Sequence, residues 1–228
     1  MGLLALIGIA LLLALIFGPQ YWVKHVIKKH SVPREDFPGT GGELAQHLLV
    51  SFNIHNVKVE VTDDGDHYDP QAHMVRLLEG HHGGRSITAI AIAAHEVGHA
   101  IQHHQGYKLL SLRQTLVKFA SVTDKFAAIF FFIAPVLGIL ARTPAAFFGM
   151  VLLGISLIAV RLIVHLVTLP VEWDASFTKA LPILEQGGYL SAEDMPAARQ
   201  VLQAAALTYL SVALSGLLDL ARWIRILR

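Results

Sequence analysis

Two histidines and a glutamate lie close together near the middle of the chain, at His95, Glu96 and His99. Residues four apart share one face of a helix, so the two imidazoles could bind a single metal ion. Glu96 lies one step round the helix, within reach of a water molecule that the metal activates, and holds no ligand position itself. The pattern therefore predicts the metal helix of a zinc hydrolase, with one catalytic Zn2+ and Glu96 as general base.

A third protein ligand is needed, because 13 histidines among 228 residues make a chance pair at this spacing a real alternative. Cysteine is absent, so that ligand must be another histidine or a carboxylate. Glu172 follows a long apolar segment that we expect to return the chain to the side on which His95 and His99 lie. Three protein ligands would leave the fourth tetrahedral position of zinc to water, as in catalytic zinc sites.

The tetrahedral intermediate of peptide hydrolysis also needs a positive or hydrogen-bonding group beside its negatively charged oxygen. The sequence offers several candidates for this role and does not choose among them. They are His165 and Arg161 in the apolar segment before Glu172, and His67 and Tyr68 upstream of the metal helix.

The composition favours a membrane protein. Hydrophobic residues make up 54% of the chain and charged residues 15%, whereas soluble domains carry about 25% charged residues. Three stretches are long and apolar enough to predict membrane helices, at residues 2–17, 126–141 and 145–169, and a fourth crossing by residues 204–220 is left open. The net charge is +1 and no basic run is interleaved with aromatic residues, so we expect no nucleic-acid partner.

Two strands are predicted just before the metal helix. Residues 57–61 alternate between apolar and polar, residues 63–66 carry turn signals, and residues 73–78 can return as the second strand of a β-hairpin. An extended peptide could pair with this hairpin as an added strand and so present its carbonyl groups to the metal.

The expected fold is a mainly α integral membrane protein with three to four transmembrane helices, in which a zincin-like region carries a small β-hairpin beside the zinc helix. Basic residues at both ends of that region predict that it faces the cytoplasm. The predicted regions are a membrane anchor (1–22), the zincin-like region (23–125), a transmembrane hairpin (126–169), the third-ligand helix with its connection (170–200), and a C-terminal membrane helix with a basic tail (201–228).

Five stretches, at residues 66–70, 75–77, 94–102, 169–176 and 206–209, resemble the YugP-like family of neutral zinc metallopeptidases of bacterial membranes. They are more distantly similar to the membrane zinc peptidases related to the CAAX prenyl endopeptidase. The resemblance implies a multi-pass protein of the bacterial inner membrane.

The same resemblance implies His95, His99 and Glu172 as the zinc ligands and Glu96 as the catalytic residue. The chain departs from the wider group at one position, because the aspartate that follows the third ligand by four residues is replaced by Ser176. Whether Asp174 takes over the role of that aspartate is left open.

We therefore expect a gluzincin-like zinc endopeptidase at the cytoplasmic surface of the lipid bilayer, acting on peptides or proteins, including membrane or misfolded proteins. Two alternatives remain. In a site-2-type intramembrane protease Asp219 would be the third ligand, although the apolar lead-in to the metal helix is too short to cross about 30 Å of hydrocarbon. A non-catalytic zinc-binding membrane adaptor would need no general base at Glu96. Substrate and oligomeric state are not predicted.

Overall fold

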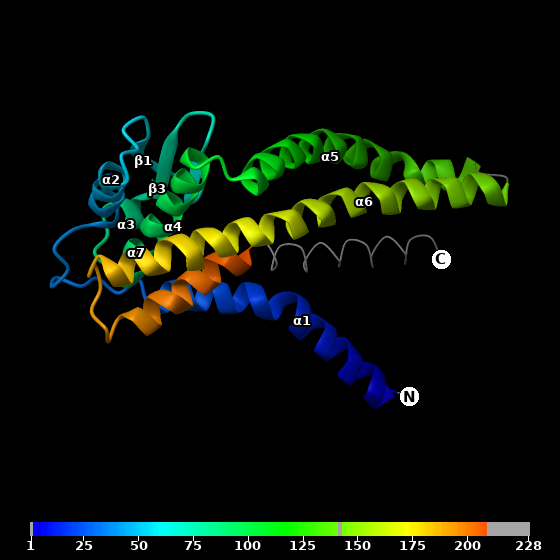
Figure 1. The fold of residues 1–228 in the computed structure, drawn as a ribbon. Helices are drawn as coiled ribbons and strands as arrows, with labels where there is room; N and C mark the ends of the chain where they lie inside the picture. Colours follow the sequence, from blue (N-terminus) through cyan, green and yellow to red (C-terminus); the bar gives the residue numbers. More distant parts are fainter. Residues whose placement is uncertain (1, 141–142, 209–228) are drawn as a thin grey trace.

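The computed structural model describes residues 2–140 and 143–208 of the chain (Figure 1). Residues 195–208, for which no label is used, form one more helical stretch. In chain order the other elements are α1 (Gly2–Lys29), α2 (Gly41–Ser51), β1 (Lys58–Thr62), β2 (His67–Asp69), β3 (Met74–Leu78), α3 (Glu79–His82), α4 (Ile87–His104), α5 (Lys108–Leu140), α6 (Pro144–Trp173), the π-helix η1 (Asp174–Ala180) and α7 (Leu181–Gln186).

The hydrophobic core lies at one end of the molecule, around α4. Every residue from 87 to 102 is buried, as expected for a helix that other elements surround on all sides. Buried apolar side chains from α2, β3, α7 and residues 198–204 pack into the same core. The helices α5 and α6 lie side by side and extend away from it, and α1 leaves the core in a separate direction (Figure 1).

The small sheet differs from the predicted hairpin. Its strand order is β1-β3-β2, with β1 parallel to β3 and β2 antiparallel to β3. The prediction that residues 57–61 and 73–78 form an antiparallel hairpin is therefore wrong. The chain reverses twice between these two segments, because the three-residue strand β2 follows the turn at residues 63–66. Strand β3, which contains most of residues 73–78, therefore lies in the middle of the sheet.

The predicted integral membrane protein with three to four transmembrane helices is contradicted. No helix within residues 2–140 and 143–208 combines the length and the apolar character that a membrane crossing requires. The predicted span at residues 126–141, for example, falls on α5 as far as residue 140, and α5 also carries Arg113, Lys118 and Lys125. A multi-pass location is thus left unsupported, and most of the predicted segment 204–220 lies outside the described residues.

Candidate metal centre

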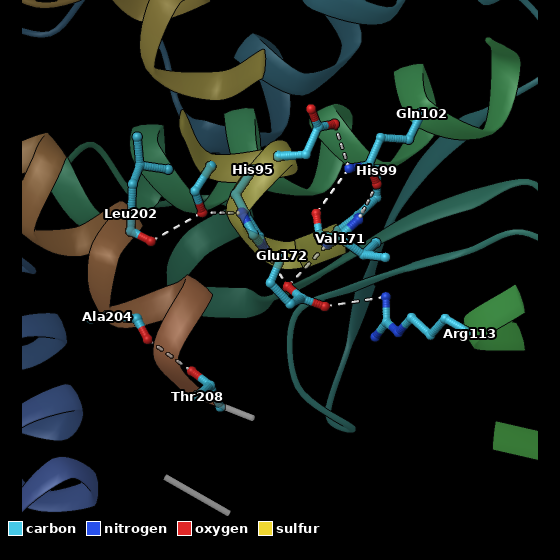
Figure 2. A network of polar contacts seen from close by, with 11 residues as sticks. His95, His99, Gln102, Arg113, Val171, Glu172, Leu202, Ala204 and Thr208 are labelled. Carbon is cyan, nitrogen blue, oxygen red and sulfur yellow. Dashed lines mark hydrogen bonds and ion pairs between the residues drawn. The ribbon is translucent and has the colours of Figure 1, made fainter. Parts of the chain in front are cut away.

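His95, His99 and Glu172 meet inside the core, the two histidines on α4 and the glutamate near the end of α6. Nε2 of each imidazole is 3.2 Å from the same carboxylate oxygen, Oε2 of Glu172. One donor atom from each residue lies within 4.8 Å of the other two, and no other group of three or more His, Cys, Asp or Glu in the described part of the chain is arranged to hold a metal. Figure 2 shows the three side chains pointing toward one another.

The close approach of α4 to η1 brings these ligands together. A methyl group added to Gly98 would lie 2.8 Å from the carbonyl oxygen of Ala175, so only a glycine allows the two backbones to lie this close. Ala175 follows Glu172 by three residues, and Gly98 lies between the two histidines. The contact between these two small residues therefore sets the distance between the imidazoles and the carboxylate.

The second nitrogen of each imidazole is also held. Nδ1 of His95 is 2.9 Å from Oγ of Ser176, and Nδ1 of His99 is 2.9 Å from Oε1 of Gln102. The Ser176 hydroxyl donates to the carbonyl of Leu202, so it accepts from His95. The Gln102 oxygen can only accept, so both Nδ1 atoms carry the hydrogen and both Nε2 atoms are left to face Glu172.

Gln102 is itself fixed by two acceptors, which settles the orientation of its amide. Its Nε2 donates to the carbonyl of Val171 at 2.9 Å, as drawn in Figure 2, and to Oδ2 of Asp174 at 2.8 Å. Asp174 thus acts on the site through Gln102 and His99. Ser176, at the position where the wider group has an aspartate, supports His95. Both residues lie on η1, and π-helical turns are frequent at functional sites.

The carboxylate of Glu172 is held in its ionised form. Burial alone would raise its pKa, but the charge of His99, hydrogen bonds from His95 and His99, and the charge of Arg113 together hold the pKa of Glu172 below its usual range. Nη1 of Arg113, on α5, lies 3.2 Å from Oε1 of Glu172 (Figure 2). This leaves the other oxygen, Oε2, to the imidazoles.

The donor set fits a divalent cation. Two Nε2 atoms and a carboxylate oxygen would repel one another as bare lone pairs, so they require either a proton on each imidazole or a shared metal ion. Two imidazoles and one carboxylate are a known catalytic ligand set for zinc. Partners on both Nδ1 atoms are the usual means by which a protein orients histidine ligands.

Glu96 is buried next to His95 and lines the same cavity as the three ligands. Burial raises the pKa of Glu96 to about 7, the charge of His95 opposes this shift, and the charge of Glu172 adds to it. A carboxyl group with a pKa near neutrality can both accept and donate a proton at physiological pH.

The cavity beside these residues has a volume of about 350 Å3 and is also lined by His67 and Tyr68. The Tyr68 hydroxyl lies 2.8 Å from Nδ1 of His103, and Nδ1 of His67 lies 2.8 Å from the carbonyl oxygen of Gly65. The role of these two residues at an oxyanion stays a prediction. His165, the third candidate, lies on α6 and is not among the residues that line the cavity. The side chain of Arg161 is not among those that the structure describes.

Several polar residues at the site were not found by sequence reasoning. Gln102 lies three residues after His99, so helical spacing could have pointed to it. Arg113 and the cavity residue His81 carried no such signal, because they reach the site only through the packing of α5 and α3 around α4. Asp66 begins one of the stretches that resemble the family, but the sequence did not assign it a role.

Comparison with known proteins gives two matches. A family model described as "Putative neutral zinc metallopeptidase" matches residues 5–228. A Bacillus subtilis (strain 168) protein named "Putative membrane protease YugP" is 36% identical over 216 residues, which are 94% of this chain and 92% of the relative. No solved structure matches the chain. Both ranges are long enough to include the metal helix as well as Glu172.

Proposed function

The chain belongs to the family of neutral zinc metallopeptidases, and from this premise we propose that it is a zinc-dependent endopeptidase. His95, His99 and Glu172 bind one zinc ion, and Glu96 is the general base. The observation that carries the proposal is the direction of the two buried imidazoles. Ser176 and Gln102 occupy both Nδ1 atoms, so both Nε2 atoms face one ionised carboxylate.

When bound, zinc supplies a Lewis acid that activates water and polarises a peptide carbonyl group. Glu96 accepts a proton from that water and later donates it to the departing amine, two transfers for which a pKa of about 7 is suited. Arg113 keeps Oε1 of Glu172 engaged, so Oε2 is the carboxylate oxygen that would be available to hold the ion. The buried surroundings exclude bulk water and strengthen these electrostatic interactions.

The substrate is a peptide or an unfolded segment of a protein, including misfolded proteins, bound in extended form. Strand β2 supports this part of the proposal, because it is an edge strand of the described sheet and His67 and Tyr68 line the cavity. Addition of the peptide backbone to that edge would bring its carbonyl groups toward the metal without selecting one side chain. Methylation of one backbone nitrogen of a bound peptide should then weaken its affinity for the inactive Glu96→Gln variant, and unchanged affinities for all N-methyl positions would contradict strand addition.

The function is tested by cleavage of an unfolded protein, with zinc content measured on the same samples. The wild type should cleave and contain one zinc per chain, while Glu96→Gln should retain the zinc and lose about 10²–10⁴-fold in rate. Glu172→Gln should lose the zinc, which separates this site from one completed by Asp219, a residue outside the described range.

The adaptor hypothesis predicts a different result. If the wild type cleaves nothing and Glu96→Gln behaves like the wild type in cells, the protein uses its zinc for structure and the peptidase proposal is wrong.

A further inference from the structure

A second polar pair lines the cavity, apart from the metal centre. Asp66 lies in the turn before β2, and His81 lies on α3. Oδ2 of Asp66 is 2.7 Å from Nδ1 of His81, and each side chain is only 14% exposed. The other oxygen, Oδ1, accepts the backbone N–H of Leu78 at 2.8 Å. Both carboxylate oxygens are therefore fixed, and the carboxylate sets the direction of the imidazole.

The contact with Asp66 occupies Nδ1 and leaves Nε2 of His81 for a ligand. Within residues 2–140 and 143–208, the side chain of His81 makes no hydrogen bond other than the one to Asp66. Its side chain lines the cavity together with Glu96 and Glu172. The Asp66–His81 pair therefore belongs to the wall of the same cavity as the candidate metal centre.

We propose that His81, held by Asp66, is a further catalytic residue that donates a hydrogen bond from Nε2 to the carbonyl oxygen of the peptide bond being cleaved. The inference rests on the proposed peptidase function and deepens it. Asp66 accepts the hydrogen on Nδ1, and a second hydrogen on Nε2 gives an imidazolium ion whose charge Asp66 balances. The hydrogen bond strengthens as the carbonyl oxygen becomes negative, and no proton is transferred in this step.

The polar side chains that line the cavity outside the three ligands and Glu96 have partners too. Tyr68 contacts His103, His67 contacts the backbone of Gly65, and Arg113 contacts Glu172. His67 and His81 both use Nδ1, but the partner of His67 is a backbone carbonyl oxygen, whereas the partner of His81 is a carboxylate, which orients the ring and can balance a positive charge on it.

Steady-state kinetics of His81→Gln tests the assignment. Loss of an oxyanion donor typically lowers kcat about 10²–10³-fold, so we expect a fall in kcat of this size with KM changed less than threefold and with one zinc retained. His82→Gln is the matched control, since His82 lies on the same short helix and packs against Gly42 of α2. It should have the kcat of the wild type.

Inhibitor binding gives a second measurement that does not depend on turnover. A phosphinic peptide carries a tetrahedral anion like that of the transition state, whereas a product peptide does not. His81→Gln and Asp66→Asn should both bind the phosphinic peptide at least 50-fold more weakly than the wild type and bind the product peptide equally well. The second variant keeps the His81 ring, so it reports on orientation and charge rather than on the loss of the imidazole.

Each outcome decides between the two proposals. An active wild type whose His81→Gln variant keeps its kcat, or loses affinity equally for both peptides, overturns the role of His81 and leaves the peptidase function intact. A zinc-loaded wild type that cleaves no peptide and binds no phosphinic inhibitor overturns both.

Discussion

The hydroxyl of Ser176 lies behind His95 and fixes the direction of its imidazole. It is fully buried, and it donates to Leu202 while it accepts from Nδ1 of His95. Groups of this kind typically contribute about 10–100-fold to metal affinity, because they hold a ligand in the orientation that the metal requires.

Ser176→Ala should therefore weaken zinc binding about 10–100-fold, since His95 would lose the acceptor for Nδ1. Competition with a chelator of known affinity measures the change. Ser156→Ala, an exposed serine of α6, is the matched control and should bind zinc as the wild type does. Equal affinities of Ser176→Ala and the wild type would show that the hydroxyl has no part in orienting His95.

Burial of Glu96 disfavours its ionised form, so this carboxyl group makes the stability of the metal-free protein depend on pH. Its pKa is about 7 when folded and about 4.5 when unfolded, so the folded state binds the proton more tightly. Its contribution to stability is therefore greatest below pH 4.5 and is lost as the pH rises through 7.

In the presence of a chelator, the free energy of unfolding of the wild type should fall by about 2 kcal/mol more than that of Glu96→Gln between pH 5 and pH 8. Urea unfolding at the two pH values measures this difference. Parallel pH dependences for the two proteins would mean that the Glu96 carboxyl is solvated in the metal-free state.

The residues of the candidate site could be proposed from the sequence because they follow local rules. His95, Glu96 and His99 lie within one and a half helical turns, and Glu172 was identified from the need for a carboxylate after an apolar segment; the structure brings both histidines and Glu172 together. The supporting role of Ser176 could not be predicted, because it depends on how η1 crosses α4.

At the scale of the elements, the site depends on the packing of α4 against η1. An alanine in place of a helical glycine normally stabilises a helix by about 1 kcal/mol. At Gly98 the added methyl group would lie 2.8 Å from a backbone carbonyl oxygen of η1, so the two elements must move apart.

Gly98→Ala should therefore destabilise the protein by about 1–3 kcal/mol and weaken zinc binding, since Glu172 and Ser176 would move away from the histidines. Thermal unfolding and zinc affinity are the two readouts. Gly149→Ala, on α6 with nothing within 4 Å of the added methyl group, should leave both unchanged or raise the stability. A Gly98→Ala variant with the zinc affinity of the wild type would show that this contact does not set the ligand distances.

The sheet shows why the pairing of strands was harder to predict than their positions in the sequence. Residues 57–61 and 73–78 were correctly expected to be strands, and the alternation of apolar and polar side chains in residues 57–61 is a local property. Their pairing depends on the short strand β2, and three residues are too few to give a periodic signal.

At the scale of the whole molecule, Arg34 ties the segment after α1 to the segment before the helical residues 195–208. Its guanidinium contacts Asp36 at 2.6 Å and Asp194 at 3.0 Å. The hydrogen bond from Arg34 is the main reason that the pKa of Asp194 lies below its usual range. The stability from this ion pair is present above the ordinary carboxyl pKa and is lost as the pH falls through the lowered value.

Asp194→Asn should consequently lower the free energy of unfolding at pH 7 and have little effect in strong acid, so its unfolding is less pH-dependent between pH 6 and pH 3. Denaturant unfolding across this range measures the effect. Asp63→Asn, an exposed aspartate of the turn after β1, serves as control. If both variants lose stability in acid as the wild type does, Arg34 does not hold these segments together through Asp194.

Overall composition was a poor guide to architecture here. The high content of apolar residues predicted membrane helices, but in the described part of the chain no helix meets the requirement for a crossing. Some apolar residues, such as Val97 and Leu202, build a core around α4, whereas others, such as Phe132 of α5 and Phe148 of α6, are exposed. The fraction of apolar residues in a sequence does not show which of them lie in the buried face of a helix inside the protein.

The central claim is that one zinc ion is held by His95, His99 and Glu172. Diffraction from crystals of the zinc-loaded protein, recorded on both sides of the zinc absorption edge, locates the ion directly. We predict one anomalous peak per chain, about 2.0–2.2 Å from Nε2 of both histidines and from Oε2 of Glu172. A fully active crystal form with its zinc on other residues, and no peak among these three, would contradict the account.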